Sequence, residues 1–293
     1  MSPTLIADYK CVCGEGPLWH ATERRLYWCD IGTGRLFRYD PAADCHEKCH
    51  QCEDGDTIGG FTVQADGALL LFMARGAVRT LHDGVVETLI PEIPGELDSR
   101  FNDVIADPQG RVYCGTMSAG ERLGRLYRLD VDGTLTTLRE DVGCSNGLAF
   151  TRDRKRLYYT DSDKRDIYLY DYDEADGALT NPRLFVHSAA ADGVPDGMTV
   201  DAEGYVWSAH WDGGCLIRYT AAGEEVSRFE FAARKVSSLT FAPGPETGGA
   251  CTDIYVTTAG GDDKEAEGAG AGALFRFDAG VAGVAEFASR VGL

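Results

Sequence analysis

Pro195-Asp196-Gly197-Met198-Thr199-Val200-Asp201 is the clearest copy of a pattern that recurs along this chain. In each copy a polar or small residue comes first, a short apolar run follows, and the run closes five positions later. The intervals between successive copies are 44, 43, 44, 50 and 41 residues. The first residues of the six copies are Glu15, Gly59, Asn102, Asn146, Asp196 and Ser237. A period of about 45 residues, built from short β-rich runs, is typical of a β-propeller with about four strands per blade. The sequence therefore predicts an all-β fold, a six-bladed β-propeller with four-stranded antiparallel blades around a central channel.

The ring of such a propeller must close, and the two ends of the chain indicate how. The N-terminal run 5–13 is expected to supply an extra strand beside 272–277. Because a closed ring of blades contains no domain boundary, residues 1–293 are expected to form one domain. The sixth repeat carries an insertion at 244–252 and a stretch rich in Gly, Ala and acidic residues at 260–272, which predicts a mobile surface loop.

The charge of the chain excludes one class of partner. It has 47 acidic and 28 basic residues and a net charge of −19, so no basic surface is available to neutralise phosphates, and we expect no nucleic-acid partner. No run of eighteen apolar residues is present, so we expect no membrane partner. The first residues lack a basic segment followed by a long apolar one, which favours a cytoplasmic protein. We expect a monomer or a weak oligomer.

Three cysteines have a spacing that resembles a metal site. Cys45-x3-Cys49-x2-Cys52 matches the spacing that holds an iron–sulfur cluster in radical enzymes, and His46 and His50 lie inside it. Three thiolates and an imidazole could also hold zinc. A radical enzyme of that kind needs an α/β barrel, however, and this chain has almost no helical periodicity. We therefore expect an incidental cluster in the polar link between the first and second repeats.

Four of the six repeat positions carry an oxygen-bearing side chain. Because equivalent positions in blades point at one axis, Glu15, Asn102, Asn146 and Asp196 are expected to converge. Two carboxylates and two amides suit hard divalent cations such as calcium, magnesium or manganese, although zinc would also bind. Alternatively, the Asn-Gly and Asp-Gly pairs are only hairpin turns. Their register places them at the start of an innermost strand instead, where the glycine is expected to let the backbone bend. Arg100 could reach the same cavity mouth.

The motifs in this order resemble the senescence-marker-protein, gluconolactonase and luciferin-regenerating-enzyme family, which includes regucalcin and bacterial sugar lactonases. The segments that carry the resemblance are 14–19, 100–103, 115–117, 145–150, 158–162, 195–204 and 255–259. The resemblance implies a six-bladed propeller that hydrolyses sugar lactones with one divalent cation, which could be Ca, Mn, Mg, Zn or Fe.

The resemblance also implies roles for individual residues. The metal ligands fall on Glu15, Asn146 and Asp196, and Asp196 is also the expected general base. Substrate contacts fall on Arg100 and Asn102. A further substrate contact after the Gly-Thr-Met motif falls on Glu121, although the spacing from Glu121 to Gly124 is one residue shorter than in the family.

These observations together predict metal-dependent hydrolysis of a sugar lactone, an aldonolactone, to the aldonic acid. The expected partner is therefore a small-molecule sugar lactone. Two alternatives use the same ligands: a non-catalytic calcium-binding or regulatory propeller, and a hydrolase of another ester or phosphoester. The ligands alone do not separate these functions, and neither the sugar nor the native metal follows from the sequence.

Overall fold

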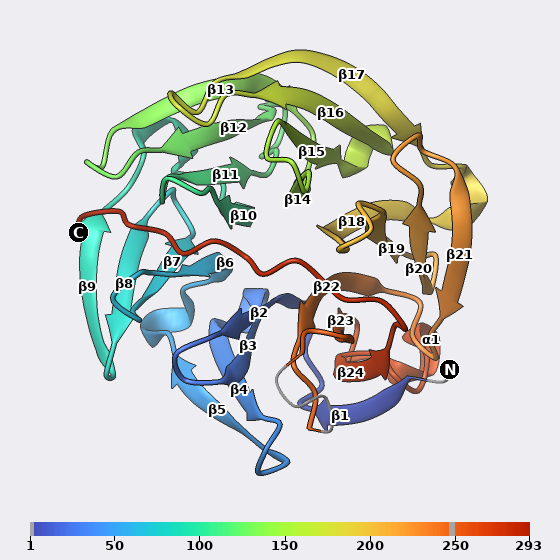
Figure 1. Cartoon of the computed structure of the whole chain (residues 1–293). Helices are drawn as coiled ribbons and strands as arrows, with labels where there is room; N and C mark the ends of the chain where they lie inside the picture. The colour runs from blue at the N-terminus through green and yellow to red at the C-terminus, as the bar shows by residue number, and fades with distance from the viewer. Residues whose placement is uncertain (1–2, 246–249) are drawn as a thin grey trace.

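The computed structural model describes residues 3–245 and 250–293. Within these residues, six four-stranded antiparallel sheets are arranged in a ring, which confirms the predicted propeller (Figure 1). In order along the chain, blades one to three are β2 (Gly14–His20), β3 (Arg25–Asp30), β4 (Arg35–Asp40), β5 (Cys45–Gln51); β6 (Ile58–Val63), β7 (Leu69–Met73), β8 (Val78–His82), β9 (Val85–Ile90); β10 (Phe101–Ala106), β11 (Val112–Thr116), β12 (Gly124–Leu129), β13 (Leu135–Val142). Blades four to six are β14 (Ser145–Phe150), β15 (Arg156–Asp161), β16 (Asp166–Tyr172), β17 (Leu179–His187); β18 (Val194–Val200), β19 (Val206–Trp211), β20 (Cys215–Tyr219), β21 (Glu225–Glu230); β22 (Val236–Ala242), β23 (Asp253–Thr258), β24 (Ala273–Asp278) and β1 (Thr4–Asp8).

The N-terminal strand closes the ring. β1 pairs antiparallel with β24, with Thr4 opposite Arg276 and Asp8 opposite Ala273. The contact continues beyond the strand, where the Cys11 amide donates to the Gly272 carbonyl at 3.0 Å. The expectation that the N-terminal run completes the last blade is therefore confirmed, and the two ends of the propeller sequence share one sheet.

Each innermost strand carries an irregularity at the predicted axial position. In β2, β6, β10, β14, β18 and β22 the pairing register with the next strand shifts at or beside that residue. A β-bulge adds one residue to a strand and re-aims the side chain there. The bulge therefore allows the first residue of the motif to face the axis while the rest of the strand packs into its blade.

Two of the glycines after these residues, Gly147 and Gly197, have a different role from the expected backbone bend. Gly147 and Gly197 do not have a positive φ. A Cβ on Gly147 would lie 2.5 Å from the Asp196 carbonyl oxygen, and one on Gly197 would overlap the Ser238 hydroxyl. Both glycines are therefore required because neighbouring innermost strands approach closely, rather than because the chain turns.

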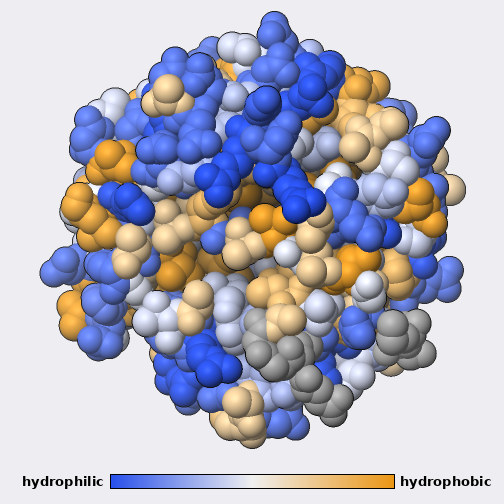
Figure 2. Space-filling model, in the orientation of Figure 1, coloured by the Kyte–Doolittle hydropathy of each residue, from blue (hydrophilic) through white to orange (hydrophobic). Residues whose placement is uncertain are grey.

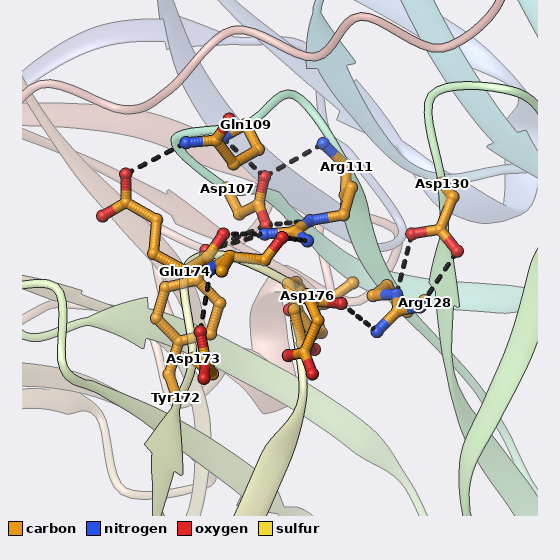
Figure 3. A network of polar contacts seen from close by, with 12 residues as sticks. Asp107, Gln109, Arg111, Arg128, Asp130, Tyr172, Asp173, Glu174 and Asp176 are labelled. Atoms are coloured by element: carbon orange, nitrogen blue, oxygen red, sulfur yellow. Dashed lines mark hydrogen bonds and ion pairs between the residues drawn. The ribbon is translucent and has the colours of Figure 1, made fainter.

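In the third repeat, the closing residue of the motif links two neighbouring blades. Asp107, which is fully buried, accepts hydrogen bonds from the backbone amides of Gln109 and Arg111 at 2.9 and 3.0 Å. Its other oxygen accepts from Arg111 Nε at 2.6 Å and from the Tyr172 hydroxyl at 2.9 Å. Arg111 also donates to the Glu174 carbonyl at 2.7 Å, which joins blade three to blade four (Figure 3). The network is structural, because each of its members is paired with a protein group.

The C-terminal segment 279–293 crosses one face of the ring in front of the channel (Figure 1). Its first part is held by a hydrogen bond from the Gly283 amide to the Cys251 carbonyl at 2.8 Å. Its end is held on the opposite side by Ser289, whose amide donates to Val63 at 2.9 Å. Between them, Glu286 and Phe287 line a channel cavity of about 70 Å³. Figure 2 shows a hollow near the centre of this face, with hydrophobic residues beside it.

Two sequence expectations about loops are wrong. The cysteine segment does not lie in a link between repeats, because Cys45–Gln51 forms β5, the outermost strand of blade one. The stretch 260–272 contains the short helix α1 (Lys264–Glu267) and is packed, with Gly261 against Lys10 and Gly270 against Phe275. The insertion 244–252 falls partly outside the described residues, which exclude 246–249. No helix in the described part of the chain is long and apolar enough to cross a membrane.

Candidate active site

The four predicted axial side chains lie around one cavity. Glu15, Asn102, Asn146 and Asp196 come from β2, β10, β14 and β18 and are only 3–5% exposed. All four line a cavity of about 270 Å³, together with Arg100. Because each residue lies at or near the start of its innermost strand, the cavity is at the end of the channel where these strands begin. The structure therefore brings together five of the six predicted site residues.

A chain of hydrogen bonds runs through the cavity from blade three to blade five. Arg100 Nη1 donates to Asn102 Oδ1 at 2.6 Å, and Asn102 Nδ2 donates to Asn146 Oδ1 at 2.8 Å. Asn146 Nδ2 then donates to Ser162 Oγ at 2.9 Å, and Ser162 Oγ donates to the Pro195 carbonyl at 2.6 Å. These hydrogen bonds determine which end of each amide is the oxygen and which is the nitrogen. They place the Asn146 oxygen toward Asn102, among the four axial side chains.

Ser162 is the part of this network that sequence reasoning missed. It is 5% exposed and begins a short 3-10 helix, η4 (Ser162–Lys164), directly after β15. Its hydroxyl is the acceptor that fixes the Asn146 amide. The only signal for it was its place at the end of the 158–162 motif, and serine is common after strands simply because it favours turns. Its role depends on a contact between blades four and five, which sequence spacing does not show.

The carboxylates of the site interact unfavourably when ionised. Burial, and then the charge of Asp103, raise the pKa of Glu15 well above its usual range. Burial, and then the charge of Glu15, do the same to the pKa of Asp196. Burial raises the pKa of Asp103, which lines the adjoining channel, to about 7. The Arg100 guanidinium lowers the pKa of all three, but it is one positive charge beside three carboxyl groups. The site therefore favours an additional cation.

The donor set fits a hard cation. Glu15 and Asp196 offer carboxylate oxygens and Asn146 offers an amide oxygen, which are the ligands that calcium, magnesium and manganese prefer. Within the residues that the structure describes, no three His, Cys, Asp or Glu side chains are grouped as metal ligands, so the amide of Asn146 is needed as a third ligand. Cys13 and Cys144 also line the cavity, but burial raises the pKa of both thiols and keeps them protonated.

The three cysteines of the segment 45–52 are not arranged around a common point. Cys45 is exposed, whereas Cys49 is half-buried and its thiol donates to the Leu36 carbonyl at 3.4 Å. Cys52, which follows β5, is buried in the core between blades one and two. Four residues along a strand span roughly 13 Å, because each residue rises about 3.3 Å. Cys45 and Cys49 are therefore too far apart along the strand to bind one ion together.

Arg100 and Glu121 differ in where the structure places them. Arg100 is half-buried in the cavity wall, and its Nε and Nη2 atoms have no hydrogen-bond partner among the described residues. Glu121 is exposed at a tight turn closed by paired hydrogen bonds between Ala119 and Arg122, at 2.8 and 3.0 Å. It is not among the residues that line the cavity. The structure therefore brings Arg100 to the site and leaves Glu121 outside it.

The chain is similar in sequence to proteins named as lactonases and in fold to solved structures. A pentonolactonase of Haloferax volcanii is 48% identical to this chain over 303 residues, which cover 100% of both proteins. A 6-deoxy-6-sulfogluconolactonase of Pseudomonas putida is 32% identical over 82% of this chain and 84% of its own length. Among solved structures, a luciferin-regenerating enzyme superposes with a TM-score of 0.87 at 27% identity, covering 99% of this chain and 100% of that one. Residues 13–260 match the family described as SMP-30/Gluconolactonase/LRE-like region. The resemblance seen in the sequence motifs is thus confirmed, and the chain belongs to the SMP-30/gluconolactonase/LRE-like family.

Proposed function

We propose that this chain hydrolyses the ring ester of a sugar lactone and releases the aldonic acid, with a divalent cation held by Glu15, Asn146 and Asp196. The observation that carries the proposal is the convergence of two buried carboxylates and two amides on one cavity whose wall holds a single guanidinium. Family membership supports it, since the pentonolactonase is 48% identical over its full length.

The cation and the side chains would have separate tasks. When bound, a divalent cation would polarise the lactone carbonyl and stabilise the negative charge that develops on its oxygen. The chain itself must then orient the lactone, take up a proton from the attacking water and return a proton to the leaving ring oxygen. These tasks can be assigned to individual residues of the cavity.

Asp196 is the proposed general base. Water attacks C1 of the lactone as Asp196 takes one of its protons, and the bond between C1 and the ring oxygen then breaks. The proton passes to the ring oxygen, which becomes the hydroxyl of the aldonic acid, so the carboxylate is regenerated. A carboxylate held beside the attacking water can accept a proton from it as a general base. Its two oxygens allow one side chain to serve both as ligand and as base.

Arg100 and Asn102 have unequal parts in substrate binding. The free Nε and Nη2 atoms of Arg100 can donate to hydroxyl groups or to the ring oxygen of a bound sugar. Both amide hydrogens of Asn102 are already used, since Nδ2 donates to the Ser145 carbonyl and to Asn146 Oδ1, each at 2.8 Å. Asn102 can offer a substrate only its remaining oxygen lone pair. We therefore infer that Asn102 mainly positions Arg100 and Asn146.

The size of the cavity supports a small substrate. Its volume of about 270 Å³ lies just below the roughly 300–1,000 Å³ of ordinary small-molecule pockets. A single five- or six-membered lactone ring with its hydroxyl groups suits this space better than an oligosaccharide. Trp211, at the end of β19, is part of the wall and offers an aromatic surface.

A lactone panel on metal-stripped and reloaded protein tests the proposal. Proton release should be measured for pentono- and hexonolactones, a simple aryl ester and a phosphoester, each with Ca²⁺, Mn²⁺, Mg²⁺, Zn²⁺ or Fe²⁺. We expect turnover of lactones only after a cation is restored. Cation binding without turnover of any substrate would favour the calcium-binding regulatory alternative, and preferred cleavage of the aryl ester or phosphoester would favour the other hydrolase.

A further inference from the structure

The charged side chains of the cavity wall are unevenly distributed. Glu15, Asp163 and Asp196 are acidic, whereas Arg100 is the only basic side chain that lines the cavity within the described residues. Glu15 and Asp196 are the proposed cation ligands, so their two charges balance those of a divalent cation. What remains at the wall is the positive Arg100 and the negative Asp163.

Asp163 is not neutralised by the protein. It is exposed in η4, and its carboxylate has no hydrogen-bond or ion-pair partner among the described residues. Its neighbour Lys164 is engaged elsewhere, with Nζ 3.0 Å from Asp161 Oδ2 and 2.7 Å from the Asp141 carbonyl. The side chain lies against Gly143, where an added Cβ would meet it at 2.5 Å. Packing therefore restricts Asp163 on one side and leaves its full charge at the cavity.

Lys235, which lies behind the Trp211 ring, is also occupied. Lys235 Nζ lies 5.4 Å from the centre of the Trp211 ring and 2.5 Å from Glu267 Oε1. Lys235 is not among the residues that line the cavity. Among the described residues that line the cavity, an anionic group on a bound sugar would therefore find no cation besides Arg100, and it would also face the charge of Asp163.

We propose that Asp163 is a specificity-determining residue that restricts this site to uncharged lactones and disfavours those with a phosphate, sulfonate or second carboxylate. This proposal rests on the proposed lactonase function. The exclusion is not a general property of the fold, since the Pseudomonas putida relative is named for a sulfonated gluconolactone. A like charge at short range lowers kcat/KM for an anionic substrate by about tenfold or more at the dielectric of a protein surface.

The test compares D-glucono-1,5-lactone with its 6-phosphate, which share one ring and differ in charge. The measured quantity is the ratio of kcat/KM for the neutral lactone to kcat/KM for the phosphate, in cation-loaded protein. In Asp163→Asn, which keeps the size of the side chain, we expect the ratio to fall about tenfold or more. Asp163→Glu keeps the charge and should keep most of the ratio. Asp83→Asn, on the remote β8–β9 turn, makes the same change in net charge and should leave the ratio as in the wild type.

Ionic strength gives a second readout that a purely structural role would not change. Added salt should raise kcat/KM for the phosphate in the wild type and have a smaller effect in Asp163→Asn, because salt screens the repulsion. An unchanged ratio in Asp163→Asn, or a wild type that prefers the phosphate, would overturn the proposal while leaving the lactonase function intact. Absence of turnover of every lactone would instead overturn both.

Discussion

Replacement of Asp196 by asparagine should slow lactone hydrolysis by about 10²–10⁴-fold, because an amide cannot take a proton from water. This corresponds to a barrier higher by about 3–5 kcal/mol, at 1.36 kcal/mol for each tenfold change. Asparagine has nearly the same shape, and the side chain faces the cavity rather than the core of a blade. We therefore expect the variant to fold, with a melting temperature no lower than that of the wild type. Loss of one of two repelling buried carboxylates favours the cation-free protein.

Glu15→Gln is the matched control. It also removes one buried carboxylate from the cation site, so both variants should bind Mn²⁺ or Ca²⁺ more weakly in a calorimetric titration. Only Asp196→Asn should also lose the base. When turnover is followed by proton release at increasing cation concentration, Glu15→Gln should regain much of the wild-type rate and Asp196→Asn should not.

Two results would refute this reasoning. An Asp196→Asn variant that binds the cation and retains near-normal turnover would exclude Asp196 as the base. Equal cation affinity in the wild type and in both variants would mean that Glu15 and Asp196 do not form the cation site. Thermal unfolding of all three proteins separates these results from a simple loss of fold.

Four further outcomes are expected. Ser162→Ala should weaken Mn²⁺ affinity about tenfold, because it releases the Asn146 amide, and unchanged affinity in calorimetry would contradict this. Arg111→Met leaves the buried Asp107 carboxylate without its ion-pair partner, so urea unfolding should show a loss of about 3–5 kcal/mol, and a loss under about 1 kcal/mol would contradict it. Glu286 is an exposed residue that also lines the channel cavity, where desolvation raises the pKa of its carboxyl from 4.5 to about 7. Stability should therefore decrease as pH rises through that window, and less so in Glu286→Gln, whereas parallel curves of melting temperature against pH would refute the effect. The three thiols of the segment 45–52 should be dispensable. The triple variant Cys45→Ser, Cys49→Ser, Cys52→Ser should therefore keep its turnover and its axial cation. Collapse of turnover with that cation still bound would give the thiols a catalytic role.

The period of the sequence was sufficient to predict the fold and the centre of the site. Six copies at nearly equal spacing predict six equivalent innermost strands, and equivalence alone requires their first residues to meet at the axis. Glu15, Asn146 and Asp196 could therefore be grouped although about 180 residues separate the first from the last. The two ends of the chain were paired correctly because an open ring would leave an unpaired edge.

The outermost strand β5 and the C-terminal segment 279–293 could not be predicted in the same way. The residues of β5 are nearly all exposed or half-buried, so the alternation of polar and apolar residues that identifies a strand is missing. The sequence Cys45–Cys52 was consequently interpreted as a link. The segment 279–293 has no periodicity either, because it is held across the channel mainly by backbone hydrogen bonds such as that of Ser289.

The location of the site depends on the two repeats that lack a polar side chain at the axis. A Cβ on Gly59 would overlap the Phe101 carbonyl, so β6 can approach β10 only with glycine there. Ser237 is fully buried, and its hydroxyl donates to the Gly14 carbonyl at 2.5 Å, which joins β22 to β2. These two positions therefore hold neighbouring strands together instead of lining the cavity. The polar side chains of the other four repeats, which belong to blades one, three, four and five, line the cavity instead and make it rich in oxygen atoms. A serine or glycine at a repeat position is thus as informative as an aspartate, because it identifies the strands that support the site.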